Sequence, residues 1–213
     1  MILREEREQV VEYGRKMVEA GLTVGTFGNV SAYHEEKNLM AISPSGLDYY
    51  NTKPQDIVVL TPEGEKVDGD RKPSSEYDMH RIFYMKRPGI KAVIHTHSTY
   101  AVTLACMNWS IPSLHYLVAY GGKEIPCSRY VQFGGWELAE SALETMSDNS
   151  ACLLGNHGLL AVGENLSYTF DVAQQIEFVS EIYYRTKTLG EPKLLSDAQI
   201  ECVLDAFKTY RLR

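Results

Sequence analysis

Apolar positions recur at helical spacing in several parts of the chain. Near the N-terminus such positions stand among many charged residues, which predicts a helix that ends by Ala20. The longest pattern of this kind predicts a helix over residues 168–189, which Gly190 and Pro192 terminate. Ser196 and Gln199 form a capping-box pattern that starts a last helix. Further helices are expected over residues 76–86, 99–107 and 135–146.

Short apolar runs bounded by Gly, Pro, Asn or Asp lie between these helices and predict β-strands. The runs at residues 151–154 and 159–162 are separated by Gly155-Asn156-His157-Gly158, a pattern typical of a tight turn. Helices and strands interspersed in this way favour an α/β or α+β class with a layered sheet. Because the chain has no internal repeat or break in composition, residues 1–213 are expected to form a single domain. The other predicted strands cover residues 29–33, 39–43, 57–60 and 92–95.

Composition narrows the classes of function. The 213 residues include 28 acidic and 21 basic ones, for a formal net charge of −7. Such a chain lacks the basic footprint of non-specific nucleic-acid binding, although a local basic patch could still bind a small anion. No apolar run reaches the length of a membrane helix, and the N-terminus does not resemble a signal peptide. The four cysteines form no C-x-x-C pair, which favours a reducing compartment, and we expect a cytoplasmic protein.

Three histidines stand out as candidate metal ligands. His95 and His97 lie two residues apart at the end of an apolar strand, so their rings should project from the same face. His157 lies beside glycine in the predicted turn, where the backbone can bend sharply and expose the ring. All three could equally be ordinary surface or core histidines. They favour a metal site only if the fold brings them together.

Glu76, Ser74 and Ser75 stand at a predicted helix start. A carboxylate in the first helical turn is explained by the helix dipole alone, and a serine there can be a simple cap. The alternative is that the serines bind an anion, because free N–H groups at a helix N-terminus suit phosphate. Two loops, at residues 25–29 and 43–46, combine glycine with small hydrogen-bonding side chains in a similar way. Each loop alone reads as a plain turn, and neither matches the P-loop pattern.

These features form five motifs in a fixed order. The motifs are Gly25-Thr26-Phe27-Gly28-Asn29-Val30-Ser31, Ser43-Pro44-Ser45-Gly46, Pro73-Ser74-Ser75-Glu76, Ile94-His95-Thr96-His97 and Gly155-Asn156-His157-Gly158. Together they resemble the class II sugar-phosphate aldolase/epimerase family over nearly the whole chain. Residues 112–116 and 207–210 are similar to segments of the members that cleave L-fuculose 1-phosphate. The resemblance implies a three-layer α/β/α fold with a mostly antiparallel central β-sheet, and a fourfold-symmetric homotetramer with active sites between subunits.

The resemblance also implies roles for individual residues. His95, His97 and His157 match the ligands of one Zn²⁺ per subunit, and Glu76 matches a catalytic carboxylate that also binds the metal when substrate is absent. Tyr116 matches a proton donor supplied by the adjacent subunit. Tyr210 matches a tyrosine of the C-terminal tail, although only three residues follow it here. The residues that match the phosphate-binding loops are Thr26, Asn29, Ser45, Gly46, Ser74 and Ser75.

The reaction implied is reversible retro-aldol cleavage of L-fuculose 1-phosphate to dihydroxyacetone phosphate and L-lactaldehyde. Zinc would act as a Lewis acid on the ketose oxygens, and the phosphate loops would position the reacting end of the substrate. Two related activities are alternatives on the same scaffold. A ribulose-phosphate 4-epimerase would have aspartate in place of Glu76, and a methylthioribulose-1-phosphate dehydratase would keep the glutamate within less similar motifs.

Two other classes of protein fit the sequence less well. A non-catalytic structural domain like the adducin head lacks the zinc site, whereas all three histidines and Glu76 are present in this chain. A metallo-β-lactamase-like hydrolase would carry aspartate and histidine just after His97, where this chain has Ser98-Thr99-Tyr100.

Overall fold

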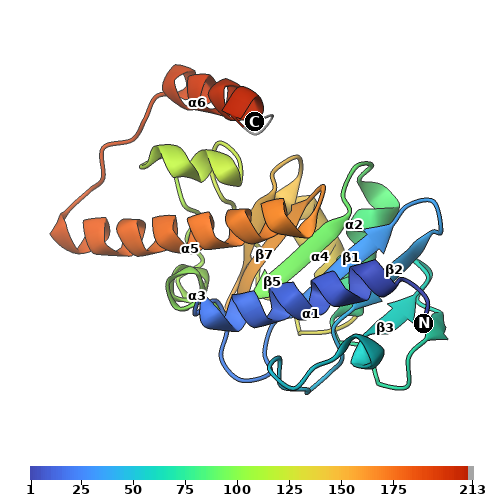
Figure 1. The fold of residues 1–213 in the computed structure, drawn as a ribbon. Helices are drawn as coiled ribbons and strands as arrows, with labels where there is room; N and C mark the ends of the chain where they lie inside the picture. The colour runs from blue at the N-terminus through green and yellow to red at the C-terminus, as the bar shows by residue number, and fades with distance from the viewer. Residues whose placement is uncertain (211–213) are drawn as a thin grey trace.

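The structure of the protein is a computed structural model. It describes residues 1–210, apart from the side chains of Lys208 and Tyr210. The described residues form a seven-stranded sheet in the order β4-β3-β2-β1-β5-β7-β6 (Figure 1). Every pair of neighbouring strands is antiparallel. The strands are β1 (Asn29–His34), β2 (Leu39–Ile42), β3 (Val58–Leu60), β4 (Lys66–Asp68), β5 (Ala92–Thr96), β6 (Ala151–Leu154) and β7 (Gly158–Gly163).

Helices cover both faces of this sheet. Successive side chains of β5 enter two different cores, since Ile94 packs with α1, α3 and α5 whereas Val93 packs with α2 and α4. Two cores separated by one sheet make three layers, so the predicted α/β/α architecture with an antiparallel sheet is confirmed. The α-helices are α1 (Arg4–Glu19), α2 (Tyr77–Lys86), α3 (Thr99–Cys106), α4 (Trp136–Met146), α5 (Leu166–Leu189) and α6 (Asp197–Tyr210).

The C-terminal helix α6 lies apart from the sheet, beyond α5 (Figure 1). It packs on the short 3-10 helix η2 (Tyr116–Tyr120), where the ring of Phe207 makes edge contacts with the rings of Tyr116 and Tyr120. The predicted capping box is present, because the backbone N–H of Ser196 donates to the side chain of Gln199 and the reverse bond also forms. This part of the chain is therefore a regular helix attached to η2 and not to the sheet.

One predicted helix begins at a different residue in the structure, and further elements appear that were not predicted. Helix α5 begins two residues earlier than expected, because the Asn165 side chain accepts a hydrogen bond from the N–H of Tyr168 and caps the helix there. Strand β4 and the 3-10 helix η1 (Pro54–Asp56) were not predicted. Strand β4 lies at the sheet edge with mostly exposed residues, so it has no apolar pattern to reveal it.

Sheet order brings three chain segments to one end of the sheet. Because β5 is antiparallel to both of its neighbours, its C-terminal end meets the N-terminal ends of β1 and β7. His95 consequently lies opposite Asn29 on one side and Leu160 on the other. The candidate residues of the Gly25–Asn29 loop, the H-x-H segment and the His157 turn therefore converge there.

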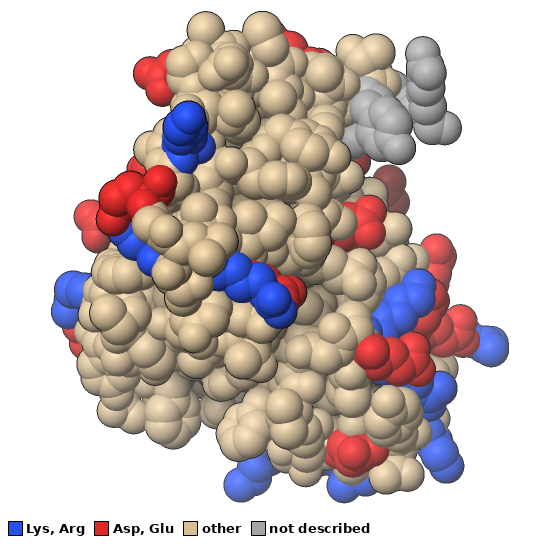
Figure 2. Space-filling view, turned by 90° about the vertical axis from the view of Figure 1, so that its left-hand side faces the viewer, with Lys and Arg blue, Asp and Glu red and all other residues tan. Residues whose placement is uncertain are grey.

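The distribution of charged side chains on the surface does not point to a particular function. On the face drawn in Figure 2, the described Lys and Arg side chains are interspersed with Asp and Glu and form no continuous basic area. Within residues 1–210, every helix is too short or too polar to span a membrane.

Candidate active site

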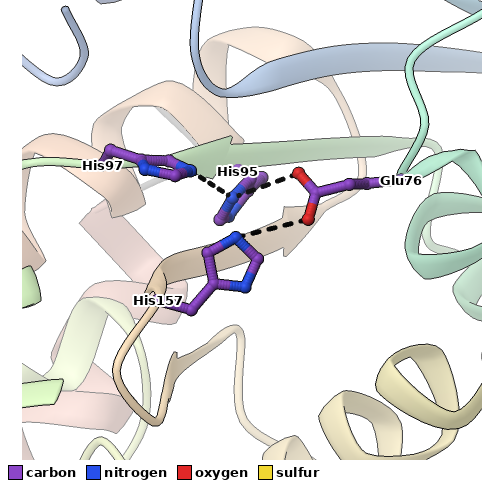
Figure 3. A group of neighbouring side chains, drawn as sticks. All are labelled: Glu76, His95, His97 and His157. Atoms are coloured by element: carbon purple, nitrogen blue, oxygen red, sulfur yellow. Dashed lines mark hydrogen bonds and ion pairs between the residues drawn. The ribbon is translucent and has the colours of Figure 1, made fainter. Parts of the chain in front are cut away.

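Glu76, His95, His97 and His157 form one cluster at this end of the sheet (Figure 3). One nitrogen or oxygen atom from each side chain lies within 4.8 Å of the others. The Nε2 atoms of His95 and His97 are 2.9 Å apart, and the Glu76 carboxylate lies 3.4 Å from His95 Nε2 and 3.3 Å from His157 Nε2. The condition set by the sequence, that the fold must bring the histidines together, is met.

Backbone groups fix which ring nitrogen of His95 faces the cluster and anchor the chain at His97. His95 is fully buried, and its Nδ1–H donates to the carbonyl of Leu159 at 3.0 Å, which leaves a lone pair on Nε2. A backbone carbonyl on the second ring nitrogen is a common outer partner of metal-bound histidine. The N–H of His97 donates to the carbonyl of Leu22, which ties the end of the strand to the loop before β1.

His157 reaches the cluster because its turn packs closely on β5. A Cβ on Gly158 would lie 2.4 Å from the carbonyl oxygen of Thr96 and 2.9 Å from the His95 ring. Only glycine allows this approach of two backbones. The turn thus delivers the ring of His157 against Glu76 and His95, so the ring is largely covered and not exposed as the Gly-flanked turn had suggested.

Electrostatics keeps all three imidazoles neutral. Burial lowers the pKa of His95 well below its usual range, and the neighbouring His157 and His97 lower it further. Burial also lowers the pKa of His97 and of His157, with the Glu76 carboxylate opposing the shift in both rings. Neutral rings present lone pairs, which is the state in which histidine binds a metal.

The donor set fits a metal ion. Three imidazole nitrogens with one carboxylate oxygen suit Zn²⁺ among the common biological cations. Oxygen Oε1 of Glu76 is buried yet accepts no hydrogen bond from any described residue, which is costly unless something else approaches it. These four residues could therefore hold a metal ion.

The two serine-containing loops are joined beside the cluster. The N–H of Ser45 donates to the carbonyl of Lys72, and the N–H of Ser74 donates to the carbonyl of Ser43. Gly46 adopts a φ of 67°, in the left-handed region that favours glycine. The hydroxyl of Ser74 accepts from the N–H of Glu76, so the same loop places both a candidate anion ligand and the carboxylate.

A cavity of about 430 Å³ opens over the cluster and collects most of the predicted residues. All six predicted phosphate-loop residues line it, together with three of the four cluster residues, Glu76, His97 and His157. Sequence reasoning did not single out Tyr130, Val131 and Phe133, which also line the cavity. The lining that the structure describes has no Lys or Arg, so an anion there would be bound by hydroxyl and N–H groups.

The structure describes the side chain of only one of the two predicted tyrosines. Tyr116 is about half exposed on η2 and is not among the cavity residues. Its expected place in the site of a neighbouring subunit stays a prediction. The side chain of Tyr210 lies outside the described part of the chain, so its predicted role is untested.

Asn29 and His80 form a contact that sequence reasoning missed. Asn29 lines the cavity, but its amide Nδ2 also donates to Oε2 of Glu76 at 2.9 Å, and its Oδ1 pairs with Nε2 of the fully buried His80. The sequence did contain a sign that His80 lies near the site. Glu76 and His80 stand four residues apart, so they share a helix face.

Comparison with known proteins gives the class. Residues 8–184 match the family described as Class II Aldolase and Adducin N-terminal domain. The chain is 50% identical to a 5-deoxy-D-ribulose 1-phosphate aldolase of Bacillus thuringiensis serovar kurstaki, over 99% of each chain. It is 40% identical to a 5-methylthioribulose-1-phosphate/5-deoxyribulose-1-phosphate aldolase of Rhodospirillum rubrum, over 96% of this chain and 91% of that protein. The solved structure of an L-fuculose 1-phosphate aldolase superposes with a TM-score of 0.95 at 42% identity, covering 98% of both chains.

The chain therefore belongs to the class II aldolase family, and the predicted family resemblance is confirmed. The expectation of an aldolase, a carbon-carbon lyase, is confirmed as well. The family match disfavours the metallo-β-lactamase-like alternative. That family includes adducin, so it is the similarity to proteins named aldolases that disfavours the adducin-like structural alternative.

Proposed function

We propose that residues 1–213 act as one catalytic domain that cleaves a deoxyketose 1-phosphate between C3 and C4 and releases dihydroxyacetone phosphate. The observation that carries this proposal is the Glu76–His95–His97–His157 cluster, which lies beside a cavity lined by the serine and glycine loops. The cluster offers metal ligands and a carboxylate, whereas the loops offer neutral donors for a phosphate.

The metal proposed is zinc, one ion per subunit, held by His95, His97 and His157 with Glu76 as a further ligand in the absence of substrate. When bound, zinc would supply a Lewis acid that polarises the ketose carbonyl. The neutral imidazoles support this assignment, as does Oε1 of Glu76, which lies 3.3 Å from His157 Nε2 but accepts no hydrogen bond from a described residue.

The protein residues handle binding and protons. The N–H and hydroxyl groups of Thr26, Ser45, Ser74 and their loop neighbours hold the phosphate, so the reacting carbons lie over Glu76. In cleavage, Tyr116 of the partner subunit acts as a phenolate and takes the proton from the C4 hydroxyl as the C3–C4 bond breaks. The bonding electron pair moves to C3 as an enediolate, and protonated Glu76 delivers its proton to C3.

5-Deoxyribulose 1-phosphate is the first candidate substrate. The two relatives described above whose names include this substrate resemble the chain over more than nine-tenths of their lengths. Cleavage between C3 and C4 would give dihydroxyacetone phosphate and acetaldehyde. L-Fuculose 1-phosphate, expected from the sequence, is the second candidate because of the TM-score of 0.95 to an aldolase named for it. It would give L-lactaldehyde instead.

The decisive experiment measures dihydroxyacetone phosphate release from both sugar phosphates with the same zinc-loaded protein. We expect the larger kcat/KM for 5-deoxyribulose 1-phosphate, and a chelator should abolish activity that added zinc restores. A larger kcat/KM for L-fuculose 1-phosphate would make it the principal substrate. If the protein epimerises a pentulose phosphate at C4 and releases no dihydroxyacetone phosphate, the epimerase alternative replaces this proposal.

A further inference from the structure

A ladder of buried polar side chains runs away from Glu76 between α2 and β1. Glu76, His80 and Tyr84 are spaced by four residues and share one face of α2. Asn29 and Ser31 are spaced by two and share the facing side of β1. All five residues are buried, and their polar atoms meet in alternation along the two elements.

The direction of every hydrogen bond in the ladder follows from its first member. A carboxylate only accepts, so Asn29 must present its NH₂ group to Oε2 of Glu76, at 2.9 Å. Its carbonyl Oδ1 then faces Nε2 of His80, which must carry the proton and donate. The remaining ring nitrogen, Nδ1, accepts from the hydroxyl of Ser31 at 2.7 Å.

The far end of the ladder completes the same pattern. The hydroxyl of Ser31 lies 2.5 Å from that of Tyr84, and because Ser31 donates to His80 it accepts from Tyr84. Burial raises the pKa of Tyr84, which keeps the phenol protonated. Burial, with a smaller contribution from the neighbouring His95, lowers the pKa of His80 to about 3. The ring is therefore neutral and carries a proton on only one of its nitrogens. Each group thus donates towards Glu76.

We propose that His80 is a positioning residue, whose Nε2–H locks the Asn29 amide in the orientation that fixes Oε2 of Glu76. This inference rests on the proposed function, in which Glu76 transfers a proton at carbon. Oε1 has no hydrogen-bond donor among the described residues, so it is the oxygen that carries the transferred proton. Without the lock the amide can rotate and turn its oxygen towards the carboxylate, where two acceptors repel each other.

Two substitutions separate this role from general stability. In His80→Gln the side-chain NH₂ can lie near the position of Nε2 and still donate to Asn29, whereas His80→Asn is too short and reaches only the position of Nδ1. The measured quantity is the exchange of a hydroxymethyl hydrogen of dihydroxyacetone phosphate with solvent deuterium, alongside kcat, KM and zinc content. Ser180→Ala serves as a stability control, because it removes a buried, hydrogen-bonded hydroxyl in α5 that is not part of the ladder.

We expect His80→Asn to slow exchange and kcat by about 10–100-fold with KM and zinc content little changed, as for outer-shell partners of other sites. His80→Gln should stay within about threefold of wild type, and Ser180→Ala should lower the melting temperature without slowing exchange. Equal effects of the two His80 substitutions, or zinc loss in step with activity, would overturn the positioning role.

A neutron crystal structure of the metal-free variants, which distinguishes the NH₂ group of Asn29 from its carbonyl oxygen, gives a readout independent of activity. Asn29 should keep its NH₂ group on Glu76 in His80→Gln and lose this contact in His80→Asn. If His80→Asn does not fold, the His80→Gln variant still tests the inference. An Asn29 amide that turns its oxygen towards Glu76 in His80→Gln would contradict it. Failure of the proposed function is a separate outcome: wild-type protein would then cleave neither sugar phosphate, and the Asn29 and Glu76 orientations would still test the role of His80.

Discussion

Two regions of the chain carry the groups proposed to move protons, and they are built differently. Glu76 lies in a buried cluster at the end of the sheet, where backbone pairing on both sides of β5 positions its neighbours. Tyr116 lies on a short 3-10 helix that packs against α6, with about half of its side chain exposed. The first region is complete within one chain, whereas the second presents its tyrosine outwards.

This difference has a physical basis. A metal site needs several ligand side chains held rigidly within a small volume. A β-sheet supplies this rigidity through its ladder of backbone hydrogen bonds. A proton donor for a substrate hydroxyl must also reach the open side of the cavity. An exposed residue meets that need when a second copy of the chain packs there, and this arrangement would account for the separation of Tyr116 from the cavity of its own chain.

The largest effect expected in the buried region is loss of the ion. His97→Ala should remove most of the zinc, which we expect at a ratio near one per subunit in wild type, and activity should fall to that of chelator-treated protein. Metal analysis of purified protein gives the measurement. His34→Ala, at the opposite end of β1, is the matched control and should keep its zinc. Full occupancy in His97→Ala would refute the ligand assignment.

The next effect concerns Glu76 and separates proton transfer at carbon from transfer at oxygen. Glu76→Gln should slow deuterium exchange into dihydroxyacetone phosphate by about 10²–10⁴-fold, because the amide cannot act as a base. Phosphate binding should persist, since the serine loops are unchanged. Tyr116→Phe should retain exchange but cleave slowly. Exchange at the wild-type rate in Glu76→Gln would mean that another base acts.

Subunit mixing tests whether the exposed region completes a neighbouring site. Glu76→Gln and Tyr116→Phe subunits, each strongly impaired in cleavage when alone, should recover roughly a quarter of wild-type activity when mixed equally, because one interface in four then joins two wild-type groups. Sedimentation or native mass spectrometry should first establish the assembly, expected to be a tetramer, and the exchange of subunits. No recovery despite proven exchange would contradict the intersubunit role of Tyr116.

A smaller effect is expected from crowding the turn that carries His157. Gly158→Ala should destabilise the protein by about 1–3 kcal/mol, since the new methyl group meets the Thr96 carbonyl at 2.4 Å. Gly89→Ala is a useful comparison, because its Cβ meets nothing within 4 Å and only its φ of 86° is unfavourable. Denaturant unfolding measures both variants. A Gly158→Ala protein as stable as wild type would show that the turn can move away from β5.

Much of the fold could be read from local patterns. Apolar periodicity located the α-helices and six of the seven strands, because each carries a buried face with the period of its backbone. The edge strand β4 escaped prediction since its residues are largely exposed. The pairing of His95 with His97 could also be anticipated, because alternation along a strand puts both rings on one side.

The sequence by itself therefore determined the local elements, the kinds of chemical groups available and the family resemblance. Only the tertiary structure decided which of those groups meet. The order of strands in the sheet brings the His157 turn to the end of β5, and the packing of α2 on β1 sets Glu76 against Asn29 and His80. Such contacts join residues far apart in the chain, and local propensity and periodicity carry no information about which distant partner an element will pack against.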